Sequence, residues 1–184
     1  MLDERAFYFQ SFPQVIQTFA KGKNSTMNPE ASMPATLIEL ADYLRAECYQ
    51  PEFYNIGPSW SHCCDTYCIE LTTAGYEAFH VERGQRSGPI WIDGNESAAC
   101  RAFIALLDGE RWSRSHCIAF TASLTEIQRI EGELGSRGIQ ATRNDIPAFS
   151  GPNNPRFRLF VTGRDKITVD QLIASGQLPP VSLR

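Results

Sequence analysis

The sequence predicts an α+β protein: an antiparallel β meander with packed helices, and a C-terminal mixed β-α-β-β-α portion. Two observations predict this class. Apolar residues recur every third or fourth position in some segments and every second position in others. The strand-like segments of the first half also form one run rather than alternating with helices, which is typical of α+β proteins. The 184 residues fit a single domain, with an N-terminal helical portion at about 1–50 and an α+β body at about 59–184.

Two helices are predicted before the first strand. Pro13 can occupy the first turn of a helix that ends at Gly22, and the polar stretch 22–32 is expected to be a loop. Pro34 opens a second helix, which the pair at 50–51 stops because a residue before proline disfavours helix. Its apolar face is formed by Leu37, Leu40, Ala41 and Leu44.

Alternation with a period of two then predicts the three strands of the meander. The first strand starts at Tyr67 and ends at a turn over 73–75. The second strand covers 76–81, and after a turn at 84–88 the third covers 89–92. Polar and apolar positions alternate on these strands, which favours an antiparallel sheet with one covered face.

The remaining elements follow from capping signals and shorter apolar runs. Asn95 is expected to cap a helix that ends at Gly109. A strand at 117–121 precedes a capping box, Ser123 to Glu126, and a helix that runs to Gly138. The last predicted elements are a strand at 139–142, a loop at 144–155, a strand at 157–162 and a helix for which Thr168 and Gln171 repeat the capping pattern.

Composition limits the classes of function. The chain is 42% hydrophobic and 21% charged, which is ordinary for a globular protein. A formal net charge of −4 disfavours nucleic acid as a partner, because nucleic-acid binders usually carry a basic patch. Asp3 and Glu4 stand near the start, no signal peptide is recognisable, and no run approaches the roughly 20 apolar residues of a membrane span. We therefore expect a cytoplasmic protein with reduced thiols and no membrane association.

The run HCCDTYC at 62–68 is the strongest candidate for metal or thiol chemistry. Its dipeptide His62-Cys63 is repeated as His116-Cys117, and these four residues are one possible zinc site. Against it, adjacent cysteines point to opposite sides of an extended chain, so they do not easily share one ion. The favoured interpretation is that no metal or cofactor binds. Most of the cysteines then act as small core residues, namely Cys64, Cys68, Cys100 and Cys117.

Two further hypotheses about reactive side chains remain, one for cysteines and one for glutamates. Cys63 or Cys117 could pair with His80 as a nucleophile, although no local motif supports this, and Cys63 could respond to oxidation. Glu77 and Glu82 on the meander are five residues apart and are expected on opposite sides of their strand. We expect them to form salt bridges on a solvated sheet face rather than an acid–base pair.

The loop at 144–155 is the strongest candidate for a binding surface. Its three prolines restrict it before a partner arrives, which lowers the entropy cost of binding. Phe149 is either an exposed anchor or the small core of the loop itself. Aromatic and arginine side chains dominate binding hot spots. Trp60, Trp112 and Arg83 are therefore also either partner contacts or partly buried structural residues.

A family resemblance adds a functional expectation. The segments YCIELTTAGYEAFHVERG, NESAACRAFIALL, NDIPAF and RFRLFVTG resemble immunity proteins of bacterial polymorphic toxin systems. Within that group the chain is most similar to immunity factors for necrotizing-type NAD-glycohydrolase toxins. The resemblance covers roughly residues 59–165 and includes no catalytic motif.

The resemblance implies an antitoxin that is not an enzyme, which binds its cognate toxin 1:1 and occludes the active site. A rigid loop would enter the cleft of the toxin, and an acidic side chain could mimic the phosphates of a dinucleotide. A surface of about 800 Å² per partner would seal the complex. The alternatives are a zinc- or thiol-dependent enzyme or sensor and a generic protein-interaction domain. The expected contact residues are Asp145, Phe149, Asn153, Asn154 and Arg156, with Arg83 second.

Overall fold

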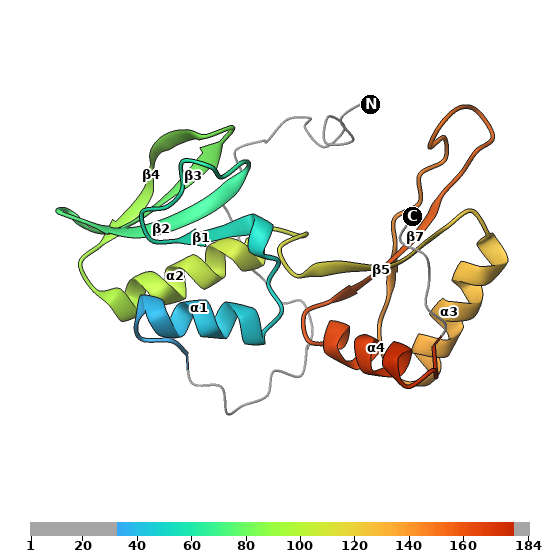
Figure 1. Cartoon of the computed structure of the whole chain (residues 1–184). Coiled ribbons are helices and arrows are strands. Elements are labelled where there is room, and N and C mark those ends of the chain that lie inside the picture. The colour runs from blue at the N-terminus through green and yellow to red at the C-terminus, as the bar shows by residue number, and fades with distance from the viewer. Residues whose placement is uncertain (1–32, 179–184) are drawn as a thin grey trace, which may run out of the picture. The chain divides into compact units, whose positions relative to one another are not determined.

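The computed structural model describes residues 33–178, which form an α+β fold with two separate sheets (Figure 1). The helix predicted at 13–22 and the loop at 22–32 lie outside the described residues. The first sheet has the order β1-β2-β3-β4 and the second has the order β5-β7-β6. Each sheet has its own cluster of buried apolar side chains.

The first sheet contains the predicted meander. Its strands β2, β3 and β4 pair antiparallel in chain order, which confirms that prediction. A further strand, β1, pairs parallel with β2 and was not anticipated, because three residues are too few to show a period. The bounds are β1 Tyr54–Ile56, β2 Thr66–Thr72, β3 Gly75–Glu82 and β4 Gln85–Asp93.

The turn between β3 and β4 is tighter than the sequence predicts. The expected turn was 84–88, but β4 already begins at Gln85, and Glu82 pairs with Gln85 across a two-residue connection. Arg83 and Gly84 both have positive φ angles, 49° and 74°. Turns of this kind match the right-handed twist of a hairpin, and an arginine in the left-handed region obscured the signal.

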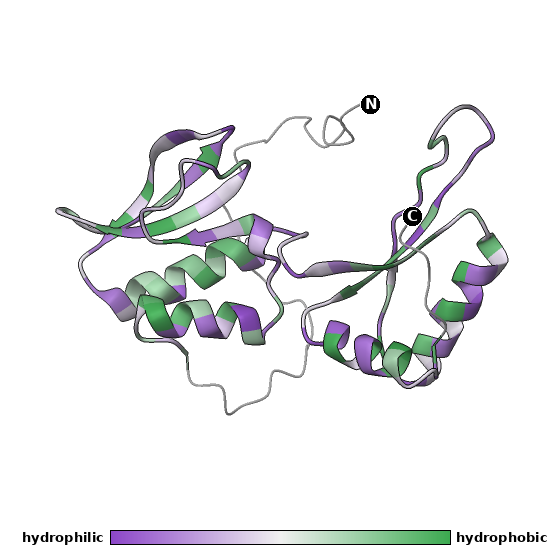
Figure 2. Ribbon diagram, in the orientation of Figure 1, coloured by the Kyte–Doolittle hydropathy of each residue, from purple (hydrophilic) through white to green (hydrophobic). Residues whose placement is uncertain are grey.

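Two helices pack on one face of the first sheet. They are α1 (Leu37–Ala46) and α2 (Glu96–Gly109), and apolar and polar residues alternate along α1 in Figure 2. The first helix begins at Leu37 rather than Pro34, because the Thr36 side chain accepts the N–H of Glu39 and caps it. Asn95 caps α2 as predicted, by accepting the N–H of Ala98. A short 3₁₀ turn, η2 (Pro51–Phe53), leads into β1.

The second sheet belongs to the predicted β-α-β-β-α portion. Its strands all pair antiparallel, and helices α3 and α4 contribute Ile127, Leu134 and Val169 to the core beneath β7. Ser123 caps α3 as predicted, but the Glu126 carboxylate accepts from the Thr121 hydroxyl instead of completing the capping box. The bounds are β5 Ser115–Thr121, α3 Leu124–Ser136, β6 Thr142–Arg143, β7 Phe157–Thr162 and α4 Asp165–Ala174.

Two predictions in this portion were wrong in detail. The strand expected at 139–142 is reduced to Thr142 and Arg143, because Ile139 instead packs in the core beside α3. The last helix begins at Asp165, so Thr168 lies inside it and does not cap it. Arg164 occupies the capping position with no side-chain hydrogen bond to the helix, and Val169 anchors the helix by burial. Between residues 33 and 178, no helix has both the length and the apolar character needed to cross a bilayer.

Candidate functional site

The loop predicted at 144–155 is a structured arm. Backbone hydrogen bonds continue the β6–β7 ladder, from Asn144 N to Arg158 O (3.1 Å) and in both directions between Ile146 and Arg156 (2.8 Å each). Near the tip, the N–H of Phe149 donates to the carbonyl of Asn154 (3.0 Å). Residues 144–156, called the arm below, form the orange projection beyond β7 in Figure 1. Its backbone is therefore ordered before any partner binds.

Phe149 combines the two expectations that the sequence left open. Its ring meets Phe120 edge-on, with centroids 5.4 Å apart, and the Arg156 guanidinium lies 5.2 Å from the ring centre. The side chain is nevertheless 37% exposed. Phe149 is thus held in one orientation by β5 and by the arm, and it still presents apolar surface to solvent.

The two predicted asparagines shape the tip of the arm. Asn153 is exposed and has a φ of 63°, a conformation that asparagine tolerates better than most residues. The Asn154 side chain donates to the Ser150 hydroxyl and accepts from Arg156 Nη1, both at 2.5 Å. Asn154 therefore acts within the arm, whereas Asn153 is exposed at its tip.

The structure separates the other predicted contact residues. Asp145 forms an ion pair with Arg143, and its carboxylate also lies 3.4 Å from the backbone N of Arg158. A role as a phosphate mimic would require Asp145 to leave this local partner. Arg83 lies in the β3–β4 turn of the first sheet, so it is not part of the arm.

One face of the second sheet carries aromatic and arginine side chains that lie far apart in the sequence. Leu159 and Val161 point into the core with α3 and α4, so the alternate positions Arg158 and Phe160 lie on the other face. The alternation of polar and apolar residues in RFRLF could have shown that Arg158 and Phe160 share one face of their strand. Sequence spacing could not show that Phe120 lies on the same face, because a long connection separates β5 from β7. We call this surface the aromatic–arginine face; it comprises Arg111, Trp112, Phe120, Phe149, Arg156, Arg158 and Phe160.

Contacts on the aromatic–arginine face link its rings in pairs and place cations over them. Trp112 meets Phe160 at 5.2 Å, as Phe120 meets Phe149. Guanidinium groups lie over three of the rings, at 4.9 Å for Arg111 over Trp112, 5.2 Å for Arg156 over Phe149 and 5.6 Å for Arg158 over Phe160. Such contacts orient both partners.

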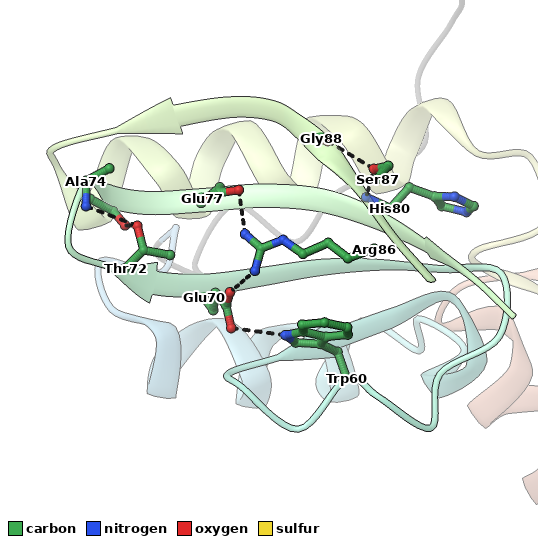
Figure 3. A network of polar contacts seen from close by, with 10 residues as sticks. Trp60, Glu70, Thr72, Ala74, Glu77, His80, Arg86, Ser87 and Gly88 are labelled. Carbon is green, nitrogen blue, oxygen red and sulfur yellow. Dashed lines mark hydrogen bonds and ion pairs between the residues drawn. The ribbon is translucent and has the colours of Figure 1, made fainter. Parts of the chain in front are cut away.

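A second polar cluster lies on the first sheet, on the side away from α1 and α2 (Figure 3). Arg86 on β4 donates to Glu70 on β2 and to Glu77 on β3, both at 2.5 Å. Trp60 adds a hydrogen bond from its indole N–H to Glu70 (3.2 Å). Glu77 was expected on a solvated face, but its side chain is only 12% exposed and that of Glu70 only 11%.

The strand register explains this cluster. Glu70 and Glu77 are directly opposite each other in the β2–β3 pair, where like charges repel. Arg86 neutralises both of them, and its guanidinium also lies over the Phe79 ring at 3.8 Å. Burial disfavours the charged form of Arg86, but the hydrogen bonds to Glu77 and Glu70 outweigh it and raise the pKa of Arg86. With both carboxylates bonded to Arg86, the cluster joins strands rather than presenting a free acid.

The four possible zinc ligands lie in different environments and do not converge on one point. His116 Nε2 lies 2.8 Å from the carbonyl of Cys48, and the Cys117 thiol donates to the carbonyl of Ala119. His62 is exposed, and Cys63 packs with Trp60 against the small core of Phe79. Across residues 33–178, no group of three or more His, Cys, Asp or Glu side chains is placed to hold a metal ion.

The cysteines divide by environment. Cys68 and Cys100 are fully buried, as expected, and burial raises the pKa of Cys68 to about 12 and that of Cys100 to about 11. The expectation was wrong for Cys64, which is exposed, because it lies in the loop before β2. Cys117 is partly buried, and burial also raises the pKa of its thiol. His80 lies 3.0 Å from Asp65 and so has a carboxylate partner.

The chain matches no protein-family model, no curated protein and no solved structure. The described residues present three notable surface features: the arm, the aromatic–arginine face and the cluster around Arg86.

Proposed function

We propose that the chain is a cytoplasmic antitoxin that binds a cognate bacterial toxin 1:1 and covers its active site, without catalysing a reaction. The observation that carries this proposal is the arm, an ordered projection that presents Phe149 to solvent near its tip. The segments NDIPAF and RFRLFVTG, which carry part of the resemblance to immunity proteins, cover the first part of the arm and all of β7.

The arm has the properties of an element that enters a cleft. Its cross-strand hydrogen bonds and three prolines remove most of the ordering cost that a flexible loop would incur. An aromatic side chain fixed by its neighbours can fill a pocket on a partner, and such anchors dominate interface energies. Asn153, at the exposed tip, can supply hydrogen bonds around that anchor.

The environments of the reactive groups favour binding over catalysis. Burial raises the pKa of Cys68, Cys100 and Cys117, so little thiolate is present at neutral pH. Glu70 and Glu77 are bonded to Arg86, which keeps them from acting as a free acid and base. These observations support a role in which the surface itself is functional.

The resemblance directs the proposal to NAD-hydrolysing toxins. Since Asp145 is paired with Arg143, we propose that Phe149, and not a carboxylate that mimics phosphate, is the first element to enter the cleft. Blocking substrate access would then depend on shape and on the apolar surface of the arm.

The test is an enzyme assay with purified candidate toxins, including NAD-hydrolysing ones. An equimolar amount of the chain should abolish NAD hydrolysis, and co-expression should restore growth. Phe149→Ala should weaken inhibition at least about tenfold, as expected for an interface anchor. Ile38→Ala is the matched control, because Ile38 is an apolar residue on α1 that is 80% exposed. The proposal is wrong if every candidate toxin remains active with excess chain.

A further inference from the structure

The fold brings two cysteines together on the side of the first sheet away from α1 and α2. Cys68 on β2 is opposite Phe79 on β3, and both side chains are fully buried in a small apolar cluster. Cys63, from the loop between β1 and β2, packs against this cluster beside Trp60. A side-chain hydrogen bond links the thiols of Cys63 and Cys68. Two cysteines that are five residues apart in the chain are therefore direct neighbours in the fold.

The backbone holds Cys63 in this position. Its N–H donates to the carbonyl of Trp60 (2.8 Å), and its carbonyl accepts the N–H of Gly84 in the β3–β4 turn (3.0 Å). The adjacent Cys64 is exposed, so the two consecutive thiols have different surroundings. The geometry therefore pairs Cys63 with Cys68 in the cluster rather than with its neighbour in the sequence.

The two thiols of this pair differ in their access to solvent. Cys68 is fully buried, and burial, together with the charge and the hydrogen bond of Cys63, raises the pKa of its thiol to about 12. Cys63 is only partly buried, so a small reagent in solution meets it first. An accessible cysteine beside a second thiol that can attack it is the usual arrangement of a reversible redox site.

We propose that Cys63 and Cys68 form a reversible disulfide, in which Cys63 reacts first with a low-molecular-weight disulfide and Cys68 then completes the bond. This site is a modification site of the chain itself. It goes beyond the proposed function and does not depend on it.

The exchange proceeds in two steps. The thiolate of Cys63 attacks one sulfur of the small disulfide, so a bond forms between these two sulfurs, the original S–S bond breaks and one small thiolate leaves. The sulfur of Cys68 then attacks the Cys63 sulfur and expels the second small thiolate. The protons of the two cysteines end on the two released thiols. The cysteine pair loses two electrons, and the small disulfide gains them.

The position of the pair favours the second step and gives the new bond a structural consequence. Because the two thiols are already in contact, the effective concentration of Cys68 at the Cys63 sulfur is high. The disulfide would tie the loop between β1 and β2 to strand β2. This loop carries Trp60, whose indole N–H donates to Glu70 (3.2 Å).

The test incubates the fully reduced full chain with oxidised glutathione, blocks the remaining thiols with iodoacetamide and maps disulfides by mass spectrometry. Cleavage before aspartate separates the two cysteines, because Asp65 lies between them and Asp42 and Asp93 flank the region. Peptides 42–64 and 65–92 should appear linked, and dithiothreitol should separate them. Linkage should need an at least tenfold lower concentration of oxidised glutathione than a mixed disulfide at the exposed Cys64.

Three variants assign the bond. Cys63→Ser should abolish the linkage, and Cys68→Ala should leave a mixed glutathione disulfide on Cys63, since the thiol that displaces the glutathione is gone. Cys64→Ser is the matched control, because it removes the neighbouring exposed thiol and should leave linkage unchanged. Circular dichroism checks that each variant is folded, and Cys63→Ser decides the question if Cys68→Ala is not.

Three outcomes would overturn the inference. The first is linkage of the two peptides that persists in Cys63→Ser. The second is linkage that is lost in Cys64→Ser. The third is an unaltered chain in which Cys63 and Cys68 stay unlinked while Cys64 takes up glutathione.

Discussion

The guanidinium carbon of Arg86 lies 3.8 Å from the centre of the Phe79 ring. The same side chain donates to Glu70 and Glu77, so a single arginine joins three strands (Figure 3). The Phe79 ring beneath it belongs to a small apolar core. Because Glu70 and Glu77 are cross-strand neighbours, the sheet depends on this cation to place two carboxylates side by side.

Replacing Arg86 with methionine should destabilise the protein. The change keeps much of the apolar stem and leaves two mostly buried carboxylates without their partner, so we expect a loss of about 2 kcal/mol, below the 3–5 kcal/mol of a fully buried pair. Urea denaturation would measure it. The control is Arg45→Met, which removes an arginine that is 74% exposed and paired with Asp42. An unchanged urea midpoint for Arg86→Met would show that the cluster adds no net stability.

Gly75 should not tolerate a side chain. Its φ is 124°, and a Cβ there would lie 2.6 Å from the carbonyl oxygen of Asp93. Gly75→Ala therefore combines backbone strain with a clash against the end of β4, and we expect a loss of at least about 2 kcal/mol. Gly88→Ala is the control, because a Cβ at Gly88 meets nothing within 4 Å. Thermal melts that show equal midpoints for the two variants would contradict the turn geometry.

The thiols should differ in reactivity. Cys64 is exposed, whereas Cys68 and Cys100 are fully buried and burial raises their pKa values. Iodoacetamide at pH 7.5 should modify Cys64 first and leave Cys68 and Cys100 unmodified until urea unfolds the chain. Peptide mapping by mass spectrometry gives the order of modification. Early labelling of Cys100 in the native protein would mean that α2 opens readily from its sheet.

Stability should fall at alkaline pH. The folded protein keeps Cys100 protonated up to a pKa of about 11 and Cys68 up to about 12, whereas unfolded thiols ionise near pH 8.5. Between about pH 9 and 12 the unfolded state therefore binds fewer protons, and the free energy of unfolding decreases as pH rises. Burial also raises the pKa of Tyr49, which acts in the same direction above pH 10.

Urea titrations at pH 8 and pH 10.5 measure this decrease. Cys100→Ala should reduce the difference between the free energies of unfolding at pH 8 and pH 10.5, although the variant is less stable at both pH values. Cys64→Ala, which removes an exposed thiol, is the control for the loss of a cysteine. A pH dependence that is the same in Cys100→Ala as in the unaltered chain would contradict this assignment.

Much of the fold could be predicted from local signals. The alternation in β2 and β3, the caps at Asn95 and Ser123 and the order of the β-α-β-β-α portion follow from neighbouring residues alone. Prediction failed where the signal was too short or misleading. Strand β1 has three residues, and Arg83 in the β3–β4 turn adopts a positive φ that is far more common for glycine.

The candidate site depended on contacts between distant residues. Phe149 was identified from its loop, but its contact with Phe120 on β5 joins residues in separate elements. Asp145 was identified as a candidate for phosphate mimicry, and its pairing with Arg143 changed that expectation. Arg156 at the end of the arm and Arg158 on β7 are visible in the sequence, but only the fold shows that they lie over the rings of Phe149 and Phe160.

The sequence by itself determined the α+β class, the meander and the helix caps at Asn95 and Ser123, because periodicity and capping depend on residues within one or two turns of each other. Tertiary structure alone decided which polar side chains meet. Arg86 is 16 residues from Glu70 and 9 from Glu77, and strand register brings all three together. The same cross-strand pairing converted a proline-containing loop into the arm, because hydrogen bonds between chain segments are set by sheet geometry rather than by sequence spacing.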